Sequence, residues 1–409
     1  MNLERKKTNR IFLLAGVAFM IVLGIRFWGN QVNAINSTML AFSYKYGFIS
    51  RGLIGSVYEM IDRILPIDME NYTAVMWFTK IVTTMFFMAL FGFFAICLNK
   101  VEESHYKKMQ ALILFYLMFA APFFVTKYNF GRLDLYMLML SILGAILLMK
   151  GHAEWLVIPI AAVATMVHQG YVFMFFNIIL VLLFCKCCDS SGKEKRKYIG
   201  MLVTTFLVAS ALFLWFELFS HVNGEAAYEE VVSRALAMSS DGKIIHTDVI
   251  DKEILGIDLT GREVPYHLQN AVQFPIFLVL VVPYLVIGIG FMRRLVKEAA
   301  GRTDKLKYLA FSVGSLTILP NLLLKVDFGR WMFAIVSYYL IVSMALIGMG
   351  DQYFGFQVEK LCRRLSARPV LGLLLFVYPF VLQPFCDVSI CHVTASIAGI
   401  INDTFLHWW

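Results

Sequence analysis

Long apolar runs constrain the fold of this chain more than any other feature. Apolar residues make up 59% of the 409 residues and are gathered in long blocks, whereas only 16% of the residues are charged. A soluble domain carries roughly 25% charged residues and spreads its apolar side chains with an amphipathic period. Uncharged runs of this length match the hydrocarbon core of a bilayer. The sequence therefore predicts an all-α polytopic integral membrane protein, built as a single transmembrane bundle over residues 1–409.

The apolar runs divide into about eleven candidate transmembrane helices. The first run lacks a small-residue cleavage site, so we expect it to be retained rather than removed as a signal peptide. The candidate spans cover residues 11–28, 74–98, 110–126, 134–149, 155–167, 171–185, 199–220, 271–292, 308–324, 331–349 and 369–385.

The segment 155–185 is expected to form a short broken hairpin rather than one span. Its residues from Trp155 to Phe184 carry no charge, and as one helix they would rise about 45 Å, beyond a hydrocarbon core of roughly 30 Å. The turn at 168–170 then lies below the outer surface of the membrane. Non-helical backbone at that depth is tolerated only inside protein or beside a water-filled cavity.

Basic residues mark one side of the predicted bundle. More than half of the 36 Lys and Arg fall in the segments 1–10, 99–109, 150–154, 186–198, 293–307 and 351–368. Because basic loops stay in the cytoplasm, we expect the N-terminus to be cytoplasmic. The net charge of +8 follows from this topology, and the sequence predicts no nucleic-acid partner.

Two segments on the opposite side are long enough to have structure of their own. Within 29–73, residues 51–65 carry apolar side chains on one helical face and polar ones on the other. This pattern predicts an amphipathic helix in the membrane interface, and an ordinary surface helix packed on the bundle fits it equally well. The segment 221–270 carries nine acids against four bases, and we expect an acidic outer loop or lid.

The C-terminal tail, residues 386–409, has two interpretations. We expect an outer-face interfacial tail, because no Lys or Arg follows to hold it inside. The alternative is a twelfth short span at 388–401. With an outer-face tail, Cys386 and Cys391 lie on the outer side, as a disulfide or as two thiols.

One sequence pattern occurs twice, each time at the junction between two apolar runs. Residues 122–132 read PFFVTKYNFGR and residues 320–330 read PNLLLKVDFGR, so both copies follow P-x4-K-x-[N/D]-F-G-R. Proline ends a helix, and glycine lets the backbone approach a ligand. The two copies are either an internal duplication or one local geometry that arose twice, and in the predicted topology both face outward.

The outer ends of the predicted spans collect several charges. Cations at membrane depth cost free energy unless they meet water, an anion or a carboxylate. Snorkelling to the headgroups is the alternative for any single side chain. We favour a site for a diphosphate, because guanidinium groups make bidentate bonds to phosphate oxygens. The predicted diphosphate-binding residues are Arg51, Lys127, Arg132, Lys325 and Arg330, and the predicted orienting residues are Asp134 and Asp327.

His168 is the predicted catalytic residue. An imidazole with a pKa of about 6.5 accepts a proton at neutral pH, although a histidine in an apolar segment also occurs as a hydrogen-bonded core residue. Glu225, Glu229 and Glu230 are further candidate bases, and a solvated loop face explains them equally well. The sequence has no Walker loop, HExxH or nucleophile elbow, and we expect neither a metal nor another cofactor.

The outer-face residues resemble those of the bacterial Wzy-type polysaccharide polymerases with their EpsG-like relatives, and more distantly those of O-antigen ligases. The likeness rests on Arg51 in KYGFISRG, Arg132 in KYNFGR, His168 in MVHQGY and Arg330 in KVDFGR. It implies a multi-pass enzyme of the bacterial cytoplasmic membrane that handles a glycan linked to undecaprenyl diphosphate. It also implies contact with membrane lipids and with a chain-length regulator or other polysaccharide-assembly proteins. Unlike the GT-C glycosyltransferases, the chain has no acid within 29–51.

The expected function is extracytoplasmic glycosyl transfer, which elongates a polyprenyl-diphosphate-linked oligosaccharide in capsular or exopolysaccharide synthesis. The arginines would hold the diphosphate and the lysines would stabilise the leaving group. His168 would deprotonate the acceptor in one metal-independent, inverting displacement. The first alternative is a transporter or flippase of a lipid-linked or anionic solute, whose site would lie at mid-membrane. The second is a membrane acyltransferase or phosphotransferase that modifies a surface glycan.

Overall fold

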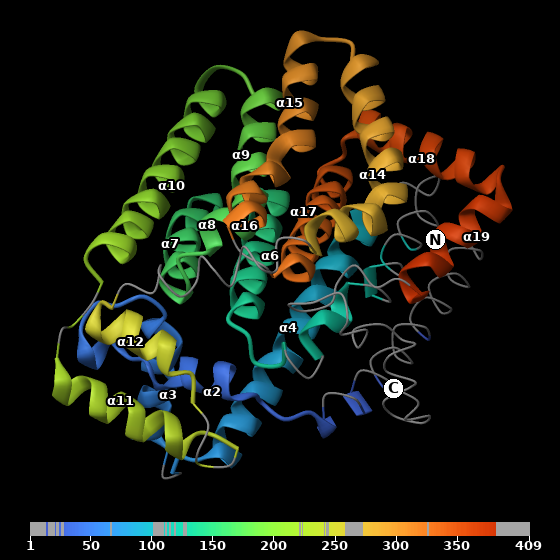
Figure 1. The fold of residues 1–409 in the computed structure, drawn as a ribbon. Coiled ribbons are helices and arrows are strands. Elements are labelled where there is room, and N and C mark those ends of the chain that lie inside the picture. The colour runs from blue at the N-terminus through green and yellow to red at the C-terminus, as the bar shows by residue number, and fades with distance from the viewer. Residues whose placement is uncertain are drawn as a thin grey trace.

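The computed structural model describes most of the chain between residues 28 and 381 (Figure 1). Within that range it leaves out residues 66–67, 101–109, 111–112, 114–115, 118–119, 126–128, 221, 223, 241, 243–244, 258–272 and 325–326. Before residue 28 it describes residues 14, 21, 24 and 25 alone.

Every regular element among the described residues is a helix, which confirms the predicted all-α class. The first half of the chain forms α2 (Ala34–Ala41), η1 (Tyr44–Tyr46), α3 (Gly52–Ile64), α4 (Tyr72–Lys100), η2 (Ala121–Val125), α6 (Asp134–Lys150), η3 (Glu154–Leu156), α7 (Val157–Val167), α8 (Tyr171–Met174) and α9 (Phe176–Asp189), where η marks a 3-10 helix. The second half forms α10 (Gly192–Leu218), α11 (Glu225–Ala237), α12 (Thr247–Leu255), α14 (Gln273–Lys297), α15 (Arg302–Val313), η4 (Gly314–Ile318), α16 (Leu319–Leu324), α17 (Phe328–Gly348), α18 (Gln352–Ser366) and α19 (Pro369–Val381).

Three of the described helices are long and apolar enough to cross a membrane, which supports the predicted membrane class. They are Tyr72–Asn99 in α4, Gly192–Leu218 in α10 and Gly329–Gly348 in α17. We compared the most apolar 18-residue stretch of each helix. In α17, 72% of that stretch is buried, and in α10 only 22% of it is buried. Hence α17 lies inside the bundle against α4, α6 and α9, and α10 turns most of its apolar surface outward, as a helix beside lipid does.

The segment 155–185 is interrupted in the structure. α7 ends at Val167, His168 is extended (φ −164°, ψ 126°), and the chain resumes as α8 and α9. The hydroxyl of Ser141 in α6 donates a hydrogen bond to the carbonyl oxygen of Phe175 at 3.2 Å, beside the junction between α8 and α9. Because α7 and α9 pack on α6 and α10, the break is surrounded by protein, which is where interrupted helices are tolerated.

The predicted span 308–324 is divided in the structure. α15 begins at Arg302 and gives way at Gly314 to η4 and then to α16. A β-carbon on Gly314 would lie 2.2 Å from the hydroxyl of Tyr338, so α17 packs directly against the backbone here. The apolar sequence continues through this break, and for that reason the sequence predicts a single helix.

Several predicted features lie outside the described residues. They are Lys127, Lys325, the tail 386–409 with Cys386 and Cys391, most of the span 11–28 and part of the span 110–126.

Connecting segments gather at two opposite ends of the bundle (Figure 1), and ion pairs join them at both ends. We name one the lysine end, which holds the α9–α10 and α14–α15 connections at the top of the figure. Its pairs join Glu154 to Lys186 (2.6 Å) and Lys197, and Lys307 to Asp189 (2.8 Å) and Asp351 (2.7 Å). We name the other the arginine end, where α2, α3, α11 and α12 lie together.

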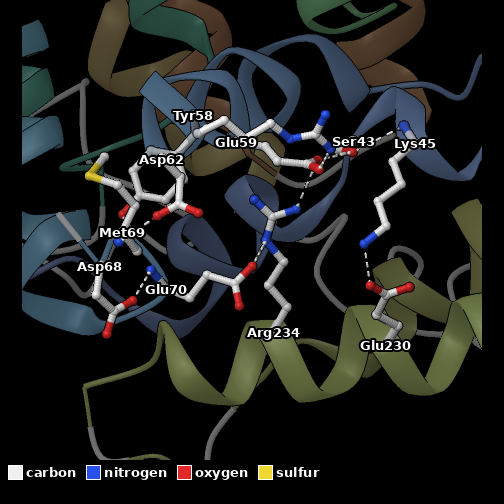
Figure 2. A network of polar contacts seen from close by, with 11 residues as sticks. Ser43, Lys45, Tyr58, Glu59, Asp62, Asp68, Met69, Glu70, Glu230 and Arg234 are labelled. Carbon is white, nitrogen blue, oxygen red and sulfur yellow. Dashed lines mark hydrogen bonds and ion pairs between the residues drawn. The ribbon is translucent and has the colours of Figure 1, made fainter. Parts of the chain in front are cut away.

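At the arginine end, α11 packs on α2 and α12 and is tied to α3 by charged side chains (Figure 2). Arg234 of α11 lies 3.5 Å from Glu59 of α3 and 3.3 Å from Glu70. Lys45 pairs with Glu230 of α11. The described part of the acidic segment therefore contains α11 and α12, and these bonds hold α11 against the segment that precedes α4.

Residues 51–65, predicted as an amphipathic helix, contain α3. Ile54 and Tyr58 are buried, and Tyr58 donates a hydrogen bond to the carbonyl oxygen of Met69 at 2.6 Å. Glu59 accepts a hydrogen bond from Ser43 at 2.7 Å, so part of the polar face contacts protein rather than solvent. Whether α3 lies in a membrane interface stays a prediction.

Candidate functional site

The two copies of the repeated pattern end beside each other. Arg132 precedes α6 by two residues, Arg330 lies in the first turn of α17, and α6 packs on α17. The turn that carries Arg132 is held by α2, because the side-chain amide of Asn36 donates a hydrogen bond to the carbonyl oxygen of Phe130 at 2.8 Å. Gly131 in that turn has a φ of 90°, which favours glycine.

Two acids link the arginines of the two copies. Nε of Arg330 donates to Oδ1 of Asp134, two residues after the first copy, at 2.8 Å, and its Nη1 donates to Oδ2 of Asp327 in its own copy at 3.2 Å. Nη1 of Arg132 lies 3.8 Å from the same Oδ2 of Asp327. Asp134 and Asp327 thus hold the guanidinium groups of both copies in fixed orientations.

Arg51 reaches the same end of the bundle from the start of α3. Its backbone is left-handed (φ 62°, ψ 1°), and its Nη1 lies 3.2 Å from Oε1 of Glu253 in α12. The Glu253 side chain is only 3% exposed. Burial raises the pKa of Glu253 above its ordinary value, and the nearby charges of Arg51 and Lys252 offset this only in part.

His168 lies between these two groups of charges. Arg51, Arg330 and Lys252 are all close enough to interact electrostatically with its ring. Nδ1 of His168 accepts a hydrogen bond from the backbone N–H of Gly170 at 2.8 Å. In a neutral imidazole one nitrogen accepts and the other carries the hydrogen, so this geometry assigns the N–H to Nε2. The structure therefore brings together His168, the two arginines of the repeated pattern and Arg51.

A polar pocket of about 160 Å³ opens beside this cluster. Its buried floor is made by Gln169, Phe216, Ser220 and Glu253. Gln169 follows His168 in the chain and accepts a hydrogen bond from the buried hydroxyl of Ser50. The pocket is thus formed where α10 and α12 meet the break in the hairpin.

The other sequence-based candidates differ in position. Glu225, Glu229 and Glu230 are all exposed on α11, and Glu230 is paired with Lys45. Lys127 and Lys325 lie outside the described residues. Among the residues that are described, no group of three or more His, Cys, Asp and Glu side chains is arranged to hold a metal ion.

Glu253 is the site residue that the sequence analysis did not single out. Its signal was nevertheless present, because Ile250, Glu253 and Ile254 follow helical spacing and all three are buried on α12. An acid on the apolar face of a short helix is an unusual placement.

Comparison with models of known protein families, with curated proteins and with solved structures gives no match to this chain.

Proposed function

We propose that the chain is a membrane glycosyltransferase that elongates a polyprenyl-diphosphate-linked oligosaccharide outside the cytoplasm, in capsular or exopolysaccharide synthesis. One observation carries the proposal: arginines from three separate parts of the chain converge with His168 at one end of an apolar helical bundle. Guanidinium groups at this position suit a diphosphate attached to a lipid.

The proposed topology has about eleven spans, a cytoplasmic N-terminus and a cavity at the outer leaflet of the bacterial cytoplasmic membrane. The distribution of charges supports it. The segments that the sequence assigns to the cytoplasm meet in ion pairs at the lysine end, as in the contact of Lys186 with Glu154 and that of Lys307 with Asp351. Basic segments of this kind stay in the cytoplasm, so the arginine end would face outward.

In the proposed reaction, Arg132 and Arg330 bind the diphosphate, with Arg51, Lys127 and Lys325 adding positive charge. A guanidinium has five N–H donors, so the bonds of Arg330 to Asp134 and Asp327 leave it donors for a phosphate oxygen. Asp134 and Asp327 keep the donors oriented. Negative charge that develops on the leaving diphosphate is stabilised by these fixed cations. His168, with its N–H on Nε2, lies at the reacting centre.

The test uses the purified protein in nanodiscs with a polyprenyl-diphosphate-linked oligosaccharide. We expect longer glycan together with released polyprenyl diphosphate, detected by mass spectrometry. Recovery of unchanged substrate would contradict the proposal. In proteoliposomes, substrate that crosses the bilayer unaltered would instead indicate a transporter. An acyl or phosphoryl group added to the glycan would indicate an acyltransferase or phosphotransferase.

A matched pair of variants tests the role of the guanidinium groups. Arg132→Lys keeps the positive charge but removes the fork that binds phosphate in bidentate fashion, and we expect weaker binding of the diphosphate lipid. Arg63→Lys is the control, because that side chain is 70% exposed on α3 and pairs with Glu59. Equal lipid binding by both variants would remove the role proposed for Arg132.

A further inference from the structure

The pocket beside the cluster has the shape and lining of a site for one sugar ring. Its volume of about 160 Å³ is smaller than the roughly 300–1,000 Å³ of pockets for drug-sized ligands. The buried ring of Phe216 offers an apolar surface, and Gln169 and Ser220 offer hydrogen-bonding groups. Exposed Glu217 and Lys252 form part of the rim, so a longer glycan can extend from the pocket into solvent.

Glu253 is buried in the floor of this pocket and keeps capacity to accept a hydrogen bond. Its Oε1 lies 3.2 Å from Nη1 of Arg51, but within the described part of the chain this oxygen has no hydrogen-bond partner of good geometry. A buried carboxylate oxygen in this state favours a bond to a hydroxyl group that enters the pocket.

The charged groups that act on Glu253 come from α3, α10 and α12 itself. Arg51 at the start of α3 and Lys252 beside it favour the carboxylate, whereas Glu217 of α10 disfavours it. Burial is the largest influence, and the pKa of Glu253 is raised overall. A glutamate whose pKa is raised is better matched to proton transfer near neutral pH than a glutamate with the ordinary pKa.

His168 is less suited to take a proton from an acceptor hydroxyl in the observed geometry. Its Nδ1 lone pair is occupied by the N–H of Gly170, and Nε2 carries the hydrogen. The ring therefore presents a donor to the site, which fits a phosphate oxygen better than a hydroxyl that must lose its proton.

We propose that the pocket binds the terminal sugar of the acceptor glycan and that Glu253 is the catalytic base that receives the proton of its attacking hydroxyl. This inference rests on the proposed function. The hydroxyl oxygen forms a bond to the anomeric carbon of the donor sugar, and the bond from that carbon to the diphosphate oxygen breaks. The electron pair leaves with the polyprenyl diphosphate beside Arg132 and Arg330, and the proton passes to Glu253.

The experiment compares Glu253→Gln with Glu194→Gln in the elongation assay described above. Glu253→Gln keeps the size of the side chain but cannot take a proton, so we expect kcat to fall about 10²- to 10⁴-fold, the usual contribution of a general base. Binding of the diphosphate lipid should be unchanged, which shows that the variant is folded. Glu194→Gln changes an exposed carboxylate in the first turn of α10, at the end of that helix opposite to the pocket, and should keep kcat within a few-fold of wild type.

The pH dependence of kcat separates Glu253 from His168. A catalytic carboxylate must be ionised, so the wild-type rate should rise with pH along an acidic limb. That limb should disappear in Glu253→Gln, persist in Glu253→Asp with a lower maximum, and persist in His168→Gln. A limb that persists in Glu253→Gln but disappears in His168→Gln would overturn the inference while leaving the glycosyltransferase intact. Absence of elongation by the wild-type protein would instead reject the proposed function itself.

Discussion

In the part of the chain that the structure describes, each end of the bundle buries one glutamate, and the pKa values of the two side chains shift in opposite directions. Glu154 at the lysine end is 2% exposed and Glu253 at the arginine end is 3% exposed. Burial raises the pKa of Glu154, but hydrogen bonds from Lys186, Lys197 and Tyr198 outweigh it, and the pKa is lowered overall. For Glu253, burial outweighs the nearby charge of Arg51, and the pKa is raised.

The difference follows from what dominates at each acid: hydrogen bonds from several donors lower the pKa of Glu154, whereas burial dominates at Glu253. At the lysine end Glu154 receives bonds on both of its oxygens, which joins the start of α7 to the α9–α10 connection. At the arginine end the donors are shared among several acids, and a pocket lies beside the cluster. The first arrangement is suited to holding segments together, and the second is suited to binding and proton transfer.

The largest effect on stability is expected when one partner of a buried pair at the arginine end is removed. Arg330→Ala leaves Asp134, only 1% exposed, without its guanidinium. Removal of one buried partner costs roughly 3–5 kcal/mol, so the thermal midpoint in nanodiscs should drop sharply. An unchanged midpoint would mean that the pair does not hold α17 against α6.

The double variant Arg330→Met, Asp134→Leu separates stability from binding. It removes both charges, which is often close to neutral when apolar side chains replace a buried pair. We expect the thermal midpoint to recover toward wild type while affinity for the diphosphate lipid stays lost. Recovery of lipid binding in the double variant would show that Arg330 acts only through structure.

A matched pair of amides tests the comparison between the two glutamates directly. Glu154→Gln weakens charge-assisted hydrogen bonds, each worth roughly 1.5–3 kcal/mol, and should lower the thermal midpoint at pH 7. Glu253→Gln should leave the midpoint unchanged or raise it, because folding disfavours the ionised form of this side chain. If both variants lost the same stability, the contrast between the two ends would be wrong.

The contributions of Glu154 and Glu253 to stability should also depend on pH in different ranges. The range for Glu154 lies below the ordinary glutamate pKa of about 4.3, and the range for Glu253 lies above it. The stabilisation from Glu154, whose folded-state pKa is lowered, is fully present above pH ~4.3 and is lost as the pH falls through that lowered value. The cost of ionising Glu253, whose folded-state pKa is raised, is absent below pH ~4.3 and grows as the pH rises toward that raised value. Thermal midpoints of wild type and both variants from pH 3 to 8 measure the two windows.

The smallest effect is expected for the contact between Lys45 and Glu230, whose side chains are 44% and 49% exposed. An exposed ion pair contributes about 0–1 kcal/mol, so Glu230→Gln should shift the thermal midpoint slightly and leave elongation unchanged. High salt should reduce even this shift. A large loss of activity would mean that α11 takes part in the reaction.

The positions of many helices can be predicted from the sequence, because the length of an apolar run and the residues that interrupt a helix can both be read locally. The span predicted at 134–149 appears as α6 at Asp134–Lys150, and the predicted break at His168 is present. The division at Gly314 was missed, and it lies where Tyr338 of another helix packs directly against the backbone. Which helix supplies that group cannot be derived from a periodic pattern.

The cations of the candidate site could be predicted from the sequence, whereas their ion pairs could not. Charged residues in apolar surroundings identify Arg132 and Arg330, but their pairing with Asp134 and Asp327 depends on how α6 meets α17. Glu253 was passed over because its segment is rich in acids. Only packing separates this buried acid from its exposed neighbours.

The backbone of Arg51 has a consequence for how this protein would evolve under different selections. A left-handed conformation costs a residue other than glycine about 1–2 kcal/mol, and Arg51 adopts one with a φ of 62°. A library randomised at this position and screened for heat resistance should therefore enrich glycine. The same library screened for polymer production should return arginine, since activity would depend on a side chain that the local backbone disfavours.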